Sequence, residues 1–188
     1  MALLNETKLR TFGSEYLQNR GRTIYAANEE LIKEAKEFSA YKTYDVFLSH
    51  RTKDASVALG MKRSIETQGL SVYVYWIEDP QSTGQPVTRS VADSLRTKMR
   101  ACKSLIYADT PDSSQSKWMP WELGYVDGYR KKVVIYPVAR GQTQQQDYQG
   151  QEYLGIYPWI TENSLTNSIL MVKDQSQVLN SLKDWINS

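Results

Sequence analysis

The fold is decided by one short stretch of the chain, YDVFLSHR at residues 44–51. Residues 44–48 predict a buried strand, because they are mostly apolar, include β-branched and aromatic side chains and are too few for a helix. Apolar residues at Ala58, Met61 and Ile65 then follow the spacing of a helix, which Gly69 can end in the left-handed conformation. A strand, a polar turn and a helix in this order open a doubly wound α/β domain, in which ligands bind at the carboxyl ends of the strands.

The same alternation continues along the chain. Further strands are predicted at 71–77, 104–108, 133–138 and 153–160, and further helices at 88–99, 117–129 and 176–186. Strands that alternate with helices at this spacing predict a central parallel sheet of about five strands with helices on both faces.

Residues 1–42 precede the opening strand and are expected to form an N-terminal extension. Asn28 can cap a helix that runs to Phe38 with an apolar face, so we expect one helix packed on the domain; a disordered tail is the alternative. The domain itself is assigned to 43–188. Within it, a variable loop and the last strand are expected at 138–160 and a C-terminal helix at 174–187.

Composition excludes several classes of protein. The net charge of +2 over 188 residues gives no electrostatic case for binding nucleic acid or an anionic membrane surface. One cysteine, Cys102, and one histidine exclude a disulfide framework, a cysteine zinc site and a multi-histidine metal site, so no metal is expected. No apolar run approaches the ~20 residues of a membrane-spanning helix, and no signal peptide opens the chain. We expect a cytoplasmic protein.

Most catalytic sequence templates are absent, including both common phosphate loops and the GxSxG nucleophile elbow. His50 fits either a Ser/His pair or a hydrogen-bonded turn. One constellation remains, SKWMPWELGY at residues 116–125, which places Trp118, Glu122 and Tyr125 on one side of a helix. A carboxylate flanked by aromatic rings can stabilise a developing cation. The alternative is an ordinary first-turn glutamate that the helix dipole favours.

Three boxes of the sequence resemble the TIR-domain family. DVFLSHR at 45–51 looks like its opening box, D-[VA]-F-[IL]-S followed by an aromatic residue or His and a basic residue. Residues 116–123 are similar to its S-x-W-x3-E-L box, 78–86 take the place of its BB loop, and 104–107 match the strand that usually ends in V-x-S. The chain departs from the pattern at Ala108-Asp109-Thr110, where the family usually has a serine.

This resemblance implies a flavodoxin-like TIR fold and one of two functions. Some TIR domains are adapters that act through TIR–TIR contacts; others cleave the nicotinamide–ribose bond of NAD with the glutamate of the third helix, which is Glu122 here. The resemblance implies NAD as substrate, with no cofactor, and substrate-binding roles for Ser49, His50, Arg51, Gly84, Trp118 and Tyr125.

The chain as a whole resembles the TIR subunit of bacterial Thoeris anti-phage systems. The resemblance implies that NAD is converted to a cyclic ADP-ribose isomer, a second messenger that activates a separate effector in antiviral defence. It also implies self-association through TIR–TIR contacts. A non-catalytic TIR adapter is the alternative, and a flavodoxin-like phosphate-binding module is a third interpretation.

Overall fold

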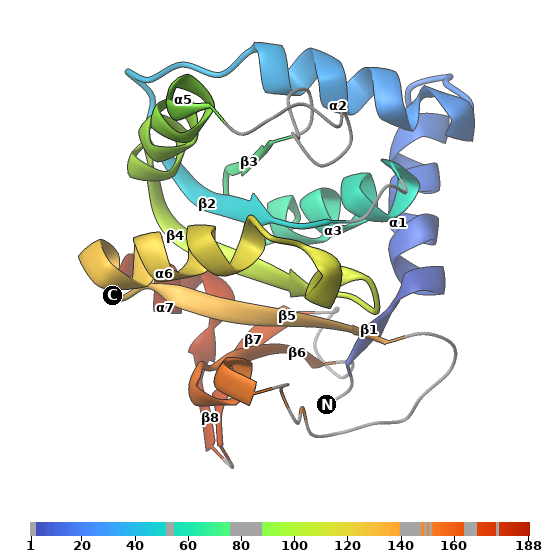
Figure 1. The fold of residues 1–188 in the computed structure, drawn as a ribbon. Helices are drawn as coiled ribbons and strands as arrows, with labels where there is room; N and C mark the ends of the chain where they lie inside the picture. Colours follow the sequence, from blue (N-terminus) through green and yellow to red (C-terminus); the bar gives the residue numbers. More distant parts are fainter. Residues whose placement is uncertain are drawn as a thin grey trace.

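The computed structural model describes residues 3–51, 55–75, 88–139, 148, 150, 152–163, 169–175 and 177–188. From β2 to β6, strands and helices alternate along the chain as predicted, and these strands lie at the centre of the molecule (Figure 1). The elements are β2 (Tyr44–Ser49), α3 (Ala55–Glu66), β3 (Val72–Val74), α5 (Arg89–Arg100), β4 (Cys102–Asp109), α6 (Met119–Arg130), β5 (Val133–Ala139) and β6 (Trp159–Asn163).

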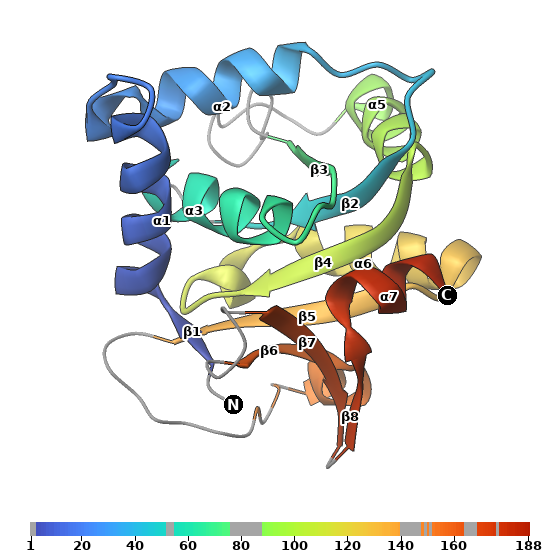
Figure 2. The same ribbon diagram turned by 180° about the vertical axis from the view of Figure 1, so that it is seen from behind.

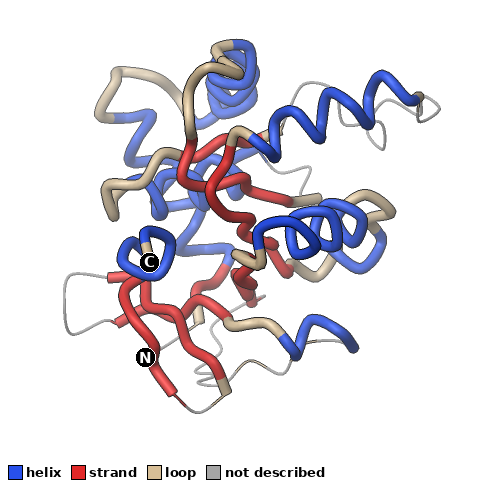
Figure 3. Tube along the Cα trace, turned by 90° about the vertical axis from the view of Figure 1, so that its left-hand side faces the viewer, coloured by secondary structure: helices blue, strands red, loops and turns tan. Residues whose placement is uncertain are grey.

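The strands form one sheet in the order β3-β2-β4-β5-β6-β7-β8, and the first five of these are mutually parallel. Because side chains alternate along a strand, each strand feeds two apolar cores. Val46 and Leu48 of β2 pack on the α3 side, whereas Phe47 packs on the side of α5 and α6. Figure 3 shows the helices on either side of the sheet. The predicted α/β fold with a central parallel sheet is therefore confirmed.

The C-terminal part differs from the prediction. A C-terminal helix was predicted at 176–186, and the domain assignment gave it as 174–187. The first half of this prediction is wrong. Strand β7 (Ile169–Asp174) and strand β8 (Gln177–Ser181) form an antiparallel hairpin, and only α7 (Leu182–Asn187) is helical. The spacing of Val178, Leu182 and Ile186 fits a helix, but Val178 is 39 % exposed, whereas Leu182 and Ile186 are buried in the core. Ser181 starts α7, since its side chain accepts from the backbone N–H of Asp184.

The strand predicted at 153–160 begins later than expected. Residues Glu152–Ile156 form a 3₁₀ helix, η3, and β6 starts only at Trp159. Gly155 and Pro158 interrupt the apolar run, and a proline cannot donate to a strand ladder. The variable loop was expected in the first part of 138–160, and most of residues 140–151 lie outside the described residues.

The N-terminal extension contains two helices where one was predicted. Strand β1 (Leu4–Asn5) pairs with β5, and α1 (Glu6–Gln18) follows it before the 3₁₀ helix η1 (Ile24–Ala26) and α2 (Ala27–Lys36). Asn28 does not cap α2, because the helix has already begun at Ala27. Leu4, Leu9 and Leu17 are buried in the same core as α3, so the extension completes that core.

Helices α1 and α3 touch through their backbones, at the left of the view in Figure 2. A Cβ atom built on Gly60 of α3 would lie 1.8 Å from the carbonyl oxygen of Leu9. One built on Gly13 of α1 would lie 2.7 Å from the carbonyl oxygen of Ser56. The absence of a side chain at both glycines lets the two helices approach this closely.

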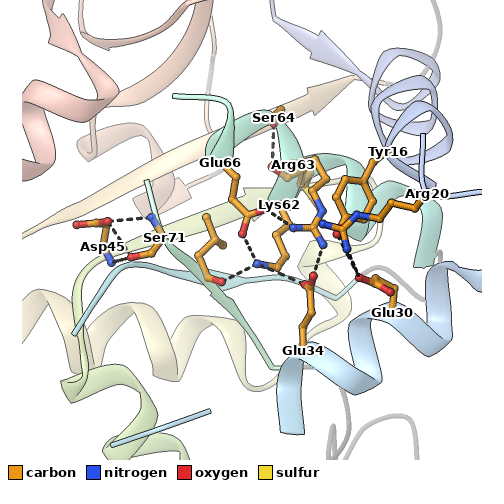
Figure 4. A network of polar contacts seen from close by, with 12 residues as sticks. Tyr16, Arg20, Glu30, Glu34, Asp45, Lys62, Arg63, Ser64, Glu66 and Ser71 are labelled. Carbon is orange, nitrogen blue, oxygen red and sulfur yellow. Dashed lines mark hydrogen bonds and ion pairs between the residues drawn. The ribbon is translucent and has the colours of Figure 1, made fainter. Parts of the chain in front are cut away.

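A polar network joins α1, α2 and α3 on the same side of the sheet (Figure 4). The Tyr16 hydroxyl donates to the buried carboxylate of Glu30 at 3.1 Å, and burial raises the pKa of Tyr16 to about 12. Arg63 pairs with Glu34 of α2, and the buried ammonium of Lys62 donates to the carbonyl oxygen of Val72 at 2.9 Å. These contacts hold α2 on α1 and α3, and α3 on the edge strand β3.

Candidate functional site

The structure brings Ser49 and Glu122 together at the carboxyl ends of the parallel strands. Ser49 ends β2 and is 1 % exposed, and Glu122 of α6 is 6 % exposed. The hydroxyl of Ser49 donates to Oε2 of Glu122 at 2.6 Å. The serine directly after the first predicted strand therefore orients the glutamate of the third predicted helix.

The start of α6 sets the position of Glu122. The Oγ atom of Ser116 accepts from the backbone N–H groups of Trp118 at 3.3 Å and Met119 at 3.1 Å, and so provides an acceptor for two N–H groups where the helix begins. Pro120 stands in the first turn, where no intrahelical donor is needed. Glu122 lies in the same turn, where the helix dipole favours a negative charge. Local sequence thus fixes a buried carboxylate at the sheet edge.

A small cavity adjoins this carboxylate. Its volume is about 20 Å³, which is enough for one water molecule. Four residues singled out in the sequence are among the described residues that line it: Ser49, His50, Trp118 and Glu122. The residues around it also include Phe47, Leu48, Tyr75, Leu95, Ser116 and Met119.

The other predicted site residues lie elsewhere or outside the described residues. Arg51 follows His50 and donates from Nη1 to Oε1 of Gln115 at 3.2 Å, so it lies over the loop that leads to α6. Tyr125 stacks on Trp121 with ring centroids 5.8 Å apart and belongs to an aromatic row on α6. Gly84 and the predicted loop 78–86 lie outside the described residues.

Burial changes the acid–base character of two groups. Desolvation lowers the pKa of His50 to about 4, so its ring is neutral at physiological pH. Desolvation raises the pKa of the buried Cys102 thiol to about 12, which removes this cysteine as a nucleophile. Over the described ranges, no cluster of three or more acidic, histidine or cysteine side chains is placed to hold a metal ion.

The pKa of His50 predicts acid-sensitive stability. The folded value of about 4 lies below the ordinary value of 6.5, so between these pH values the unfolded chain binds a proton that the folded chain does not. The free energy of unfolding should therefore fall as the pH drops through this window, by up to about 3 kcal/mol. Urea unfolding of the wild type and of His50→Gln, at neutral pH and near pH 4, measures it. The wild type should lose more stability than the variant; an equal loss would exclude His50 as the cause.

Sequence reasoning missed one polar group at the same end of the sheet. Asp109 ends β4, and its two carboxylate oxygens accept hydrogen bonds from Ser113 Oγ and from the Tyr148 hydroxyl, each at 2.7 Å. The sequence showed this position only as part of a departure from a pattern. A carboxylate directly after an apolar strand was the signal that could have identified it.

Comparison with known proteins identifies the family. No family model matches the chain. A probable 3′ cyclic ADP-D-ribose synthase, ThsB′, of Bacillus cereus (strain MSX-D12) is 46 % identical over 143 residues, covering 76 % of this chain and 74 % of that protein. A putative cyclic ADP-D-ribose synthase, TIR2, of Cytobacillus dafuensis is 29 % identical over 85 residues, or 45 % of this chain and 22 % of that longer protein.

The alignment with the more similar of these two relatives covers most of each chain. Among the described helices, none is long and apolar enough to cross a membrane. Together with the two boxes that meet at Ser49 and Glu122, this similarity confirms the resemblance seen in the sequence, and the chain belongs to the TIR-domain family of Thoeris-type defence.

Proposed function

We propose that this chain is an NAD-cleaving enzyme that breaks the nicotinamide–ribose bond and forms a cyclic ADP-ribose isomer. The observation that carries the proposal is the buried carboxylate of Glu122, oriented by Ser49 beside a cavity at the carboxyl ends of the strands. The names of both relatives, each called a cyclic ADP-D-ribose synthase, support it.

The chemistry matches this arrangement. When the bond breaks, its electron pair stays on the nicotinamide nitrogen, which leaves as a neutral group, and the ribose C1 gains oxocarbenium character. A carboxylate placed beforehand in a site with little water stabilises that positive charge without reorganising during the reaction. Glu122 supplies the charge. Ser49 holds one carboxylate oxygen of Glu122 in place.

The residues around Glu122 provide contacts for the rest of the substrate. Trp118 lines the cavity and can stack on a substrate ring. The neutral ring of His50 can donate or accept a hydrogen bond without adding a positive charge that would oppose the developing cation. Arg51 can bind the pyrophosphate through its guanidinium group. Substrate contacts by Gly84 and Tyr125 remain part of the proposal.

The acceptor that attacks the ribose decides the product. Attack by water gives linear ADP-ribose. Attack by the adenosine end of the same molecule gives a cyclic product, which high effective molarity favours when the substrate is bound in a folded form. The Bacillus cereus relative is named a 3′ cyclic ADP-D-ribose synthase, and we propose the same type of product for this chain. In this product a ribose hydroxyl forms the bond that closes the ring.

Incubation of the protein with NAD, followed by chromatography and mass spectrometry, tests the proposal. The expected result is release of nicotinamide and a product with the mass of NAD minus nicotinamide. A product that carries one added water throughout would make the chain a plain NAD hydrolase. Intact NAD at every protein concentration would favour the adapter alternative.

We further propose that the enzyme is completed by self-association and that its product diffuses to a separate effector in antiviral defence. The cavity beside Glu122 has about 20 Å³ available, whereas ligand sites usually have about 300–1,000 Å³, so the site must open before NAD binds. Contact between TIR domains is one source of the energy for that change.

A dilution series tests the self-association. The rate of NAD cleavage per milligram of protein should rise steeply with protein concentration, and crowding agents should raise it further. Light scattering on the same samples should show assemblies over the same concentration range. A rate per milligram that stays constant down to the dilute monomer would exclude assembly as the activating step.

A further inference from the structure

A second carboxylate lies at the same end and on the same face of the sheet as Glu122. Side chains two residues apart along a strand point to the same face. Leu105 and Tyr107 of β4 pack in the core beneath α6, so Asp109, the next residue in that alternation, projects toward the α6 side. Ser49, which holds Glu122, pairs in register with Tyr107 on the neighbouring strand.

Tyr107 stands beside residues that lead to both carboxylates: it pairs in register with Ser49, and Asp109 follows it by two residues on β4. The phenol of Tyr107 is buried, and this burial is the main cause that raises its pKa. Smaller contributions in the same direction come from Tyr153 and from the negative charges of Asp109 and Glu122. The register of β2 with β4, and the face that Ser49, Tyr107 and Asp109 share, place both carboxylates at the same end of the sheet. The cavity lies beside Glu122 toward β3, as its lining by Tyr75 and Leu95 shows, and Asp109 lies on the β4 side.

The contacts of Asp109 hold it in one orientation. Oδ1 accepts from Ser113 in η2 (Ser113–Gln115), the 3₁₀ turn after β4, and Oδ2 accepts from Tyr148, from the segment after β5. Each carboxylate oxygen can accept a second hydrogen bond. The group is half-buried rather than sealed in the core. It is therefore a fixed acceptor at the edge where ligands of such sheets bind.

We propose that Asp109 is the acceptor-side carboxylate of the reaction: it binds the ribose hydroxyl that closes the ring and takes its proton. This inference rests on the proposed function and assigns a second role at the same site. Glu122 stabilises the ribose that loses nicotinamide, and Asp109 serves the ribose that attacks it. The two roles need two carboxylates because one group cannot hold both ribose rings at once.

The step balances without any further reagent. The C1–nitrogen bond of the nicotinamide riboside breaks, and its electron pair stays on nicotinamide. The oxygen of the attacking hydroxyl forms the new C1–O bond, and its proton moves to the Asp109 carboxylate and then to water. The products are the cyclic nucleotide, nicotinamide and one proton. Without a base on the acceptor side, the oxocarbenium ion is left to water, and the linear product forms instead.

The experiment compares Asp109→Asn with the wild type at a protein concentration at which the wild type turns over NAD. Nicotinamide release and the ratio of cyclic to linear product are measured together. We expect that ratio to fall at least about tenfold, with a smaller loss in nicotinamide release. A purely structural role of Asp109 would lower both products together and leave the ratio unchanged.

The chain offers a matched control in Asp127, a second aspartate that accepts from a tyrosine, with 3.0 Å between its Oδ2 and the hydroxyl of Tyr157. Asp127→Asn on α6 should leave the product ratio at the wild-type value. If Asp109→Asn does not fold, Tyr148→Phe, which removes one donor to Asp109, should still lower the ratio severalfold. An unchanged ratio in the folded variants would overturn this inference alone. A wild type that releases no nicotinamide would overturn the proposed function and this inference with it.

Discussion

Glu122→Gln is expected to abolish NAD cleavage while the protein stays folded. The substitution keeps the shape of the side chain, and its amide oxygen can still accept the hydrogen bond from Ser49. It removes only the negative charge that stabilises the oxocarbenium ion, and we expect the rate to fall by about 10³-fold or more. Nicotinamide release by the purified variant at matched concentration measures the effect. The melting temperature should change little, because a buried charge gives way to a neutral group of equal size.

A second buried glutamate serves as the control. Glu162 of β6 is 4 % exposed and pairs with Lys8 of α1, on the core side opposite to α6. Glu162→Gln breaks an ion pair and should lower stability more than Glu122→Gln does, yet it should leave the rate of NAD cleavage near that of the wild type. If Glu122→Gln cleaves NAD at a comparable rate with an unchanged circular dichroism spectrum, the proposed catalytic role is wrong.

The parts of the fold that the sequence predicted are those with strong local signals. The β2 strand was predicted to within one residue, because buried parallel strands read as apolar runs. Helix α5 begins after Thr88, whose side chain accepts from the backbone N–H of Val91. The left-handed Gly69, with a φ of 77°, ends the turn after α3 as expected.

The parts that were missed depend on partners far away in the sequence. Most side chains of strand β8 are exposed, so the spacing of its apolar residues does not indicate a strand. The strand is defined by its pairing with β7, which the local sequence does not show. Helix α1 is stabilised by packing on α3, which lies some fifty residues further along the chain. The local sequence of α1 shows its own apolar face but not the face of α3 on which it packs.

In the candidate site, too, the sequence predicted the local features and missed the contacts between distant segments. The box around Trp118 and Glu122 could be predicted because its spacing is a local property of one helix. The contact between Ser49 and Glu122 spans two boxes, and only a correct sheet topology brings them together. Asp109 was overlooked because its partners, Ser113 and Tyr148, come from a 3₁₀ turn and from a segment without a sequence motif.

The largest expected effect on stability is that of Gly60→Ala. The new methyl group would lie 1.8 Å from the Leu9 carbonyl oxygen, and this neighbour is backbone rather than the end of a flexible side chain. Helix α1 must therefore move away from α3, which uncovers the buried leucines at 9 and 17. We expect a loss of about 3 kcal/mol in the free energy of unfolding, at the upper end for overpacked cores, and a fall in melting temperature of roughly 10 °C.

Gly128→Ala on α6 makes the same chemical change without the same contact. A Cβ atom there meets nothing within 4 Å, so the substitution should stabilise the protein by about 0.5–1 kcal/mol, because alanine is the better helix former. Urea unfolding of the two variants beside the wild type gives both numbers, which should differ in sign. A Gly60→Ala protein as stable as Gly128→Ala would show that α1 does not pack on α3 in solution. The N-terminal extension would then be an arm, and the core would close without it.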